Sequence, residues 1–168
     1  MLTEISKIKS FPLGSIKMTD GYCVNALSRE VDYLKAFDLN RVLAGFRRNA
    51  GLDDKGAHPY GGWERMLIGG HAMGHYFTAL AQAAVNPGVS ESDRAEIRRM
   101  LDEIMSGLAE CQLENGFLWG SAVLDKNNVE AQFDNVEDGK CDLFREAWVP
   151  WYTMHKILEG LIAAYSVA

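Results

Sequence analysis

The sequence predicts an all-α fold for most of its 168 residues. Apolar residues recur every three to four positions over several long stretches, which is the spacing that gives a helix one apolar face. The breaks between these stretches carry glycine, proline, asparagine or aspartate, the residues that end helices and form turns. No stretch shows the sustained alternation of apolar and polar residues that is typical of a half-buried strand.

The chain is expected to open with an extended lead-in and then to become helical. Residues 1–19 contain Pro12 and Gly14, which interrupt a helix, so no regular element is expected there. Residues 20–168 form the helical part. Its first helix is expected from about Asp20, where apolar residues begin to recur at helical spacing, namely Val24, Leu27, Val31, Leu34 and Phe37.

A second helix is expected near Asp38, because Asp38 or Asn40 can cap its first turn. Gly51 gives this helix a C-terminal stop. Its apolar positions follow the spacing i, i+3, i+4 and i+7 and are Leu39, Val42, Leu43 and Phe46. Residues 51–69 then form a long glycine-rich loop. A loop of this size is usually functional or disordered, and its aromatic residues favour an ordered one.

Two helices are expected in the middle of the chain, from Gly70 to about Ala84 and from about Ser90 to Cys111. Ser90 followed by Asp93 resembles the capping box that opens a helix. The second of these helices has the most regular apolar stripe in the sequence, which consists of Ile97, Leu101, Ile104, Met105, Leu108 and Cys111.

The last part of the chain combines an irregular segment with a final helix. Residues 120–147 carry turn signals and no helical pattern. Pro150 suits the first turn of a helix, which we expect to run from Trp151 to Tyr165. No glycine, asparagine or proline ends this helix, so we expect the chain to be truncated; the alternative is a frayed terminal helix.

Composition narrows the possible partners. A formal net charge of −6 argues against nucleic acid. No stretch approaches the ~20 apolar residues that a membrane span requires, and the first residues lack the plan of a signal peptide. Cys23, Cys111 and Cys141 form no CxxC pair and support neither a disulfide framework nor a complete zinc site. Composition determines neither the compartment nor the oligomeric state.

The segment 60–76 is the best candidate for a functional site. It holds two Gly-Gly pairs together with Trp63, Glu64, His71 and His75. Because glycine permits close approach of backbone, a segment this rich in glycine and functional side chains indicates a pocket wall. On a helix, the two histidines lie on one face about one turn apart.

Three interpretations of these histidines stay open. A metal would need a third ligand such as His58, Glu64 or His155, and Ala72 stands where a zincin helix carries its catalytic glutamate. One imidazole could instead cap a helix or bond a loop carbonyl. We favour a polar contact with a ligand in a cleft.

Carboxylates and thiols offer further chemistry. Two carboxyl groups about 5–10 Å apart would suit glycoside hydrolysis. The available carboxylates are Asp53, Asp54, Glu64 and Glu146, and Glu64 is the most credible of them. A catalytic cysteine is not expected, because nothing local lowers the pKa of Cys23 or Cys111 and the support at Cys141 is weak.

Six stretches, taken in order, resemble the opening of the glycoside hydrolase family 127 and 146 group, the β-L-arabinofuranosidases. These stretches are residues 41–52, 60–64 and 68–76, then 108–112 with 115–118, 148–156 and 160–165. Together they span about residues 17–168. The resemblance implies a partial (α/α)6 barrel, a helical toroid of which this chain is the N-terminal portion only.

The family resemblance also implies a function. The family members are retaining hydrolases that remove terminal β-L-arabinofuranose from plant-type glycans, so the expected partner is a carbohydrate substrate. The residues expected to contact the sugar are Trp63, Glu64, His71, His75 and His155. The family nucleophile is a zinc-bound cysteine, with a glutamate as acid/base and one Glu and three Cys as metal ligands.

This sequence departs from the family pattern at the reactive residues. Cys23, Cys111 and Cys141 do not match the metal-binding cysteines, so no catalytic residue is assigned and no zinc is expected to bind this chain. We therefore expect the chain alone to be inactive. The alternative functions are a non-catalytic helical carbohydrate-binding or scaffold module, and a metal protein that uses His71, His75 and His155.

Overall fold

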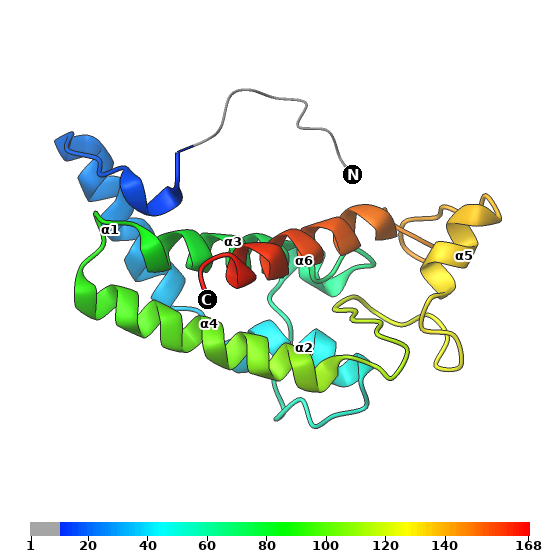
Figure 1. Ribbon diagram of the computed structural model, residues 1–168. Helices are drawn as coiled ribbons and strands as arrows, with labels where there is room; N and C mark the ends of the chain where they lie inside the picture. The colour runs from blue at the N-terminus through cyan, green and yellow to red at the C-terminus, as the bar shows by residue number, and fades with distance from the viewer. Residues whose placement is uncertain (1–10) are drawn as a thin grey trace, which may run out of the picture.

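A computed structural model describes residues 11–168 and shows an all-α fold, as the sequence predicts (Figure 1). Within these residues the only β pairing is an isolated bridge between Asp125 and Asn128. The helices are α1 (Gly21–Lys35), α2 (Leu39–Asn49), α3 (His71–Val85), α4 (Glu91–Cys111), α5 (Ala131–Glu137) and α6 (Pro150–Tyr165), with 3-10 turns η1 (Leu13–Ser15) and η2 (Gly62–Arg65).

The two N-terminal helices begin at the expected places, and the structure adds a cap at Asp20 that was not predicted. The Asp20 carboxylate accepts the backbone N–H groups of Tyr22 and Cys23, and the Asp38 carboxylate accepts that of Asn40. Gly51 has a φ of 71° and ends the α2 region in a left-handed conformation that suits glycine. Residues 1–10 of the expected lead-in lie outside the described residues, and the η1 turn interrupts the remainder.

Helices α3 and α6 pack side by side and run in the same direction (Figure 1). The start of α3 meets the first half of α6: a Cβ added to Gly74 would clash with the carbonyl oxygen of Lys156. A Cβ on Gly160 would in turn lie 2.6 Å from the carbonyl oxygen of Gly74. The two glycines therefore let the helix backbones touch, which is a close approach that only glycine allows.

Helix α4 supplies the core surface on which α2 and α3 pack. Ser90 caps it by accepting the N–H of Asp93, and the Asp93 carboxylate accepts the Ser90 hydroxyl rather than its N–H. All residues of the predicted stripe are buried except Met105, which is partly buried. The Cys111 thiol lies at the end of this stripe, and burial raises its pKa, as suits a buried apolar thiol.

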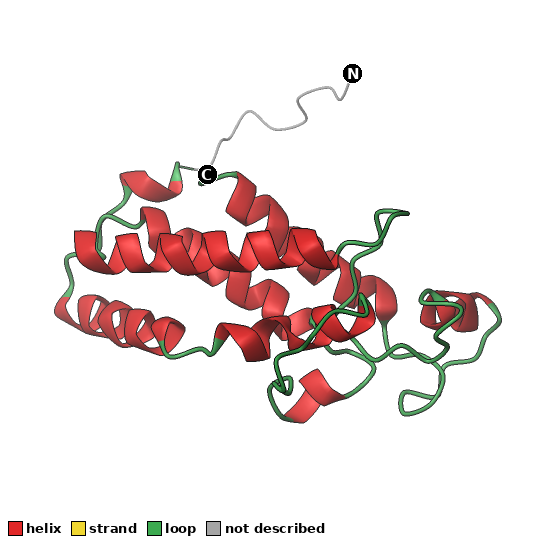
Figure 2. Ribbon diagram, turned by 90° about the horizontal axis from the view of Figure 1, so that it is seen from below, coloured by secondary structure: helices red, strands yellow, loops and turns green. Residues whose placement is uncertain are grey.

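The loops collect at one end of the molecule, where α3 and α6 begin (Figure 2). The short helix α5 lies in this region, within the segment that the sequence predicts to be irregular. None of the helices over residues 11–168 combines the length and the apolarity needed to cross a bilayer. The arrangement fits part of a helical toroid, with the loop end as the natural place for a site.

Candidate functional site

The side chain of Glu64 caps the start of α3, although Glu64 lies several residues before the helix. It lies in the η2 turn, is buried, and accepts the backbone N–H of Gly70 at 2.7 Å and that of Ala72 at 3.0 Å. The residue at the N-cap position itself is Gly70, which has no side chain and a φ of 95°. The carboxylate of Glu64 therefore satisfies backbone donors that a local cap would otherwise bind.

The His71 ring is held in one orientation by two acceptors. Its Nδ1 lies 2.9 Å from the carbonyl oxygen of Ile68 and 2.9 Å from Oε1 of Glu64. Because both partners accept, Nδ1 carries the proton, and Nε2 of a neutral ring is then an acceptor. The loop-carbonyl interpretation thus describes the Nδ1 edge of this imidazole. His71 is 9% exposed, and its Nε2 has no hydrogen-bond partner among residues 11–168.

Aromatic rings surround this imidazole. The Trp63 ring centroid lies 6.1 Å from that of His71 and 5.7 Å from that of Trp148. The ring centroid of Tyr152, in the first turn of α6, lies 6.2 Å from that of His71. Trp63 is 61% exposed although the carboxylate beside it is buried, so its indole face is open to a ligand.

His75 lies one turn further along α3 and is exposed. Desolvation of the ring lowers its pKa below the ordinary value for histidine, and the charge of the nearby Lys156 ammonium lowers it further. His71 and His155 contribute in the same direction, and Glu159 opposes them. At neutral pH His75 is therefore an uncharged imidazole that can both donate and accept a hydrogen bond.

The five residues expected to contact a sugar occur around the start of α3 and α6. Glu64 bonds to His71, and the ring of His71 lies 6.1 Å from that of Trp63. Within the described part of the chain, the only link between His155 on α6 and His75 on α3 is the charge of His155, which lowers the pKa of His75. Sequence reasoning gave no role to Trp148 and Tyr152, which complete the aromatic surround. Tyr152 precedes His155 by three positions on the same helix, and that spacing is the signal that identifies its face.

The metal interpretation has no support among residues 11–168. No group of three or more histidine, cysteine or carboxylate side chains there could hold a metal ion. Cys23 is partly buried on α1, Cys111 is buried on α4 and Cys141 is exposed in a loop. The described residues therefore do not fit the zinc site that the family resemblance implies.

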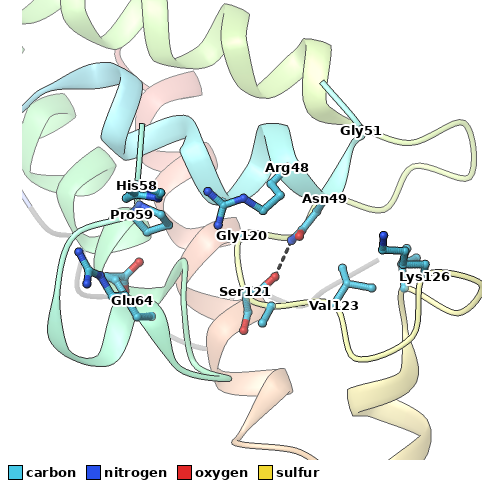
Figure 3. Close-up of a pocket in the computed structure, with 14 residues that line it drawn as sticks. Arg48, Asn49, Gly51, His58, Pro59, Glu64, Gly120, Ser121, Val123 and Lys126 are labelled. Carbon is cyan, nitrogen blue, oxygen red and sulfur yellow. Dashed lines mark hydrogen bonds between the residues drawn. The ribbon is translucent and has the colours of Figure 1, made fainter. Parts of the chain in front are cut away.

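A cleft of about 780 Å³ lies on the other side of Glu64 (Figure 3). Its floor is where α2 meets the chain at Gly120: the Asn49 amide donates to the carbonyl oxygens of Trp119 and Ser121, and Gly45 packs against Gly120. Glu64 lines this cleft and also contacts His71. The carboxylate thus stands between the imidazole face and the cleft.

The structure is thus an all-α fold with imidazoles and aromatic rings near the points where α3 and α6 begin, consistent with part of a helical toroid. The model of the family described as beta-L-arabinofuranosidase, GH127 catalytic domain, matches residues 15–168. The chain therefore belongs to the GH127 β-L-arabinofuranosidase family, as its sequence motifs predict. A comparison with curated proteins gives no match.

Proposed function

We propose that this chain forms the sugar-binding wall of a hydrolase that removes terminal β-L-arabinofuranose from plant-type glycans. The wall consists of Trp63, His71, His75, Tyr152 and His155, and Glu64 supports it from behind. The reaction is retaining, and its nucleophile and zinc site come from residues other than those of this chain. Membership of the family supports this proposal.

The observation that carries the proposal is the fixed imidazole of His71 beside an open indole. Because Nδ1 is bound to two acceptors, Nε2 of His71 is free to accept a hydrogen bond from a sugar hydroxyl. The exposed face of Trp63 offers an apolar surface to the C–H groups of the sugar ring. A few oriented polar groups beside aromatic rings are typical of small-molecule sites.

The side chains have separate tasks in this proposal. Trp63 and Tyr152 hold the ring, and the uncharged His75 bonds a second hydroxyl. Glu64 is a positioning residue, since both of its oxygens are already occupied by backbone N–H groups and by His71. The sugar is thereby oriented for attack by groups that the rest of the site supplies.

Binding of methyl β-L-arabinofuranoside, measured by NMR titration, tests the proposal. Trp63→Ala should weaken binding about tenfold or more, because one aromatic platform is worth roughly 1–2 kcal/mol. Trp151→Ala is the matched control: Trp151 is 62% exposed and packs on Phe133 rather than on His71. It should change binding less than twofold. Equal losses in the two variants, or no saturable binding by the unmodified chain, would refute the sugar-binding wall.

Hydrolysis by the same chain tests the second half of the proposal. An aryl β-L-arabinofuranoside should not be cleaved above the buffer rate, since the nucleophile is placed elsewhere. Sustained turnover that survives repurification would show that these residues contain the reactive groups.

A further inference from the structure

We propose that the cleft beyond Glu64 is a second binding site, which takes an oligosaccharide bearing carboxylate groups. Its assignment to a saccharide rests on the proposed function, and the cleft would hold the part of the glycan that extends past the arabinose. The proposal arises from the charges that line the cleft.

The lining is cationic in a chain that is acidic as a whole. Arg48, Arg65 and Lys126 line the cleft, and Glu64 is the one carboxylate among its lining residues. The net charge of the chain is −6, so the positive charge of this cluster is opposite to that of the chain as a whole. Cations gathered along the walls of a cleft focus the local potential and attract anions.

These cations are available to a ligand. Among residues 11–168, Arg65 and Lys126 form no hydrogen bond or ion pair with another side chain. Arg48 binds Asp54 through Nε and Nη2, with Nη2 2.9 Å from Oδ2, and this pairing holds the pKa of Asp54 below its ordinary value. The Nη1 group of Arg48 has no acceptor in the same part of the chain, so the guanidinium is held in place with one edge free.

The position of the cations favours an extended ligand over a single compact ion. Figure 3 shows Lys126 at one side of the cleft, Arg48 near its centre and Glu64 at the other side. A volume of about 780 Å³ falls in the range of roughly 300–1,000 Å³ found for small-molecule sites and exceeds what one phosphate needs. Charges spaced along a cleft of this size match carboxylates spaced along a chain of sugars.

The remaining lining suits the uncharged parts of a saccharide. Pro59, Val123 and Val129 present apolar surface that C–H faces of sugar rings can cover. Arginine binds a carboxylate in a planar, two-point manner, whereas lysine offers a point charge. Because Glu64 borders both sites, a ligand in the cleft would end next to the imidazole face.

Isothermal titration of the chain with trigalacturonate, a neutral trigalactose and inorganic phosphate tests the proposal. Trigalacturonate should bind at least tenfold more tightly than either of the others, and its affinity should fall as salt is added. Affinity for the neutral sugar equal to that for the acidic one would overturn the assigned charge preference. Phosphate binding as tight as trigalacturonate binding would overturn the assignment to an extended saccharide.

Charge-removing variants locate the site. Arg65→Gln combined with Lys126→Gln should weaken trigalacturonate binding about tenfold. Arg98→Gln combined with Arg99→Gln removes the same charge from the exposed side of α4 and should change it less than twofold. Circular dichroism confirms that both double variants fold. Equal weakening in the two would show that net charge alone attracts the ligand and would overturn the site.

The same variants separate this proposal from the proposed function. Trp63→Ala should weaken the arabinofuranoside and leave trigalacturonate binding unchanged within twofold, and the cleft variant should do the reverse. If the unmodified chain binds trigalacturonate but not the arabinofuranoside, the sugar-binding wall is refuted and the cleft proposal is not. If trigalacturonate does not bind, the proposal that the cleft binds an acidic oligosaccharide is refuted, whether or not the arabinofuranoside binds.

Discussion

Glu64 shows how one side chain can support both a helix and a site. Its carboxylate accepts two backbone N–H groups at the start of α3 and one imidazole N–H from His71. Hydrogen bonds to a charged acceptor are stronger than neutral ones, and all three donors lie at buried or partly buried positions. A change at Glu64 therefore removes the partner of three donors at once.

Glu64→Ala is expected to lower the free energy of unfolding by about 2–3 kcal/mol, since buried donors lose a charged acceptor. Urea denaturation followed by circular dichroism measures the change. Glu110→Ala, at an exposed carboxylate on α4, should change stability by less than about 0.5 kcal/mol. If both substitutions have the same small effect, Glu64 does not anchor α3.

Thr153 poses the opposite case, a buried polar atom without a partner. Its side chain is fully buried on α6, and its hydroxyl has no hydrogen-bond partner among the described residues. Valine has the same shape without the hydroxyl, so it fills the space with no desolvation penalty. The structure therefore predicts that the protein with threonine at position 153 is less stable than the protein with valine there.

Thr153→Val is expected to raise the free energy of unfolding by about 1 kcal/mol. Thr78→Val is the comparison, because the Thr78 hydroxyl donates to the carbonyl oxygen of Gly74 at 3.2 Å and its removal brings no such gain. Thermal unfolding of both variants decides the matter. A lower melting temperature for Thr153→Val would mean that its hydroxyl is satisfied in solution.

At the scale of the elements, the contact between α3 and α6 depends on two glycines. Gly74 and Gly160 lie on facing sides of the two helices, and each leaves room for the backbone of the other helix. Glycine inside a helix costs roughly 1 kcal/mol relative to alanine, so its presence twice in one contact indicates a packing requirement. The site residues on α3 and α6 are held together by this contact.

Gly74→Ala is expected to destabilise the chain by about 3 kcal/mol or to prevent folding, because the new Cβ meets a backbone oxygen that cannot move alone. Gly21→Ala, at the start of α1 with open space around it, should leave stability unchanged or slightly improved. Melting temperatures of the two variants provide the measurement. Equal melting temperatures would show that the helices can separate at no cost.

Most elements could be predicted from the sequence because their signals are local. Asp20, Asp38 and Ser90 each cap the helix that follows them, and the stripe on α4 has helical spacing. Helix α5 could not, because it has seven residues and no side-chain cap. It is held by Gln132, which donates to the Ser121 hydroxyl and the Ala122 carbonyl and accepts the N–H of Trp148. Such contacts join segments that are distant in the sequence.

The same distinction applies to the site. Glycine content and the spacing of the two histidines point to the segment that carries Trp63, Glu64 and His71. The capping role of Glu64 is not visible in the sequence, because the donors it binds lie six and eight residues later, outside the usual capping distance. The cleft is equally hidden, since its cations come from α2, the η2 turn and the loop before α5.

At the scale of the whole molecule, the family resemblance contributes what composition and periodicity cannot. Helical periodicity gives the number and length of helices, and it leaves open how they are arranged. The close contact of α3 and α6 depends on glycines that face each other on helices separated in the sequence by the whole of α4 and α5. Parallel neighbours of this kind are consistent with part of a helical toroid, and the family match agrees with that arrangement.

The parallel course of α3 and α6 also gives the molecule an electrical polarity. The peptide dipoles of a helix add up to about half a positive charge at its N-terminus. Since both helices begin at the loop end, their positive poles lie together there, and α6 has no acidic residue in its first turn to offset its own. The Glu64 carboxylate already occupies the positive pole of α3, so the partial positive charge at the start of α6 is the one that no acidic residue of its own first turn offsets.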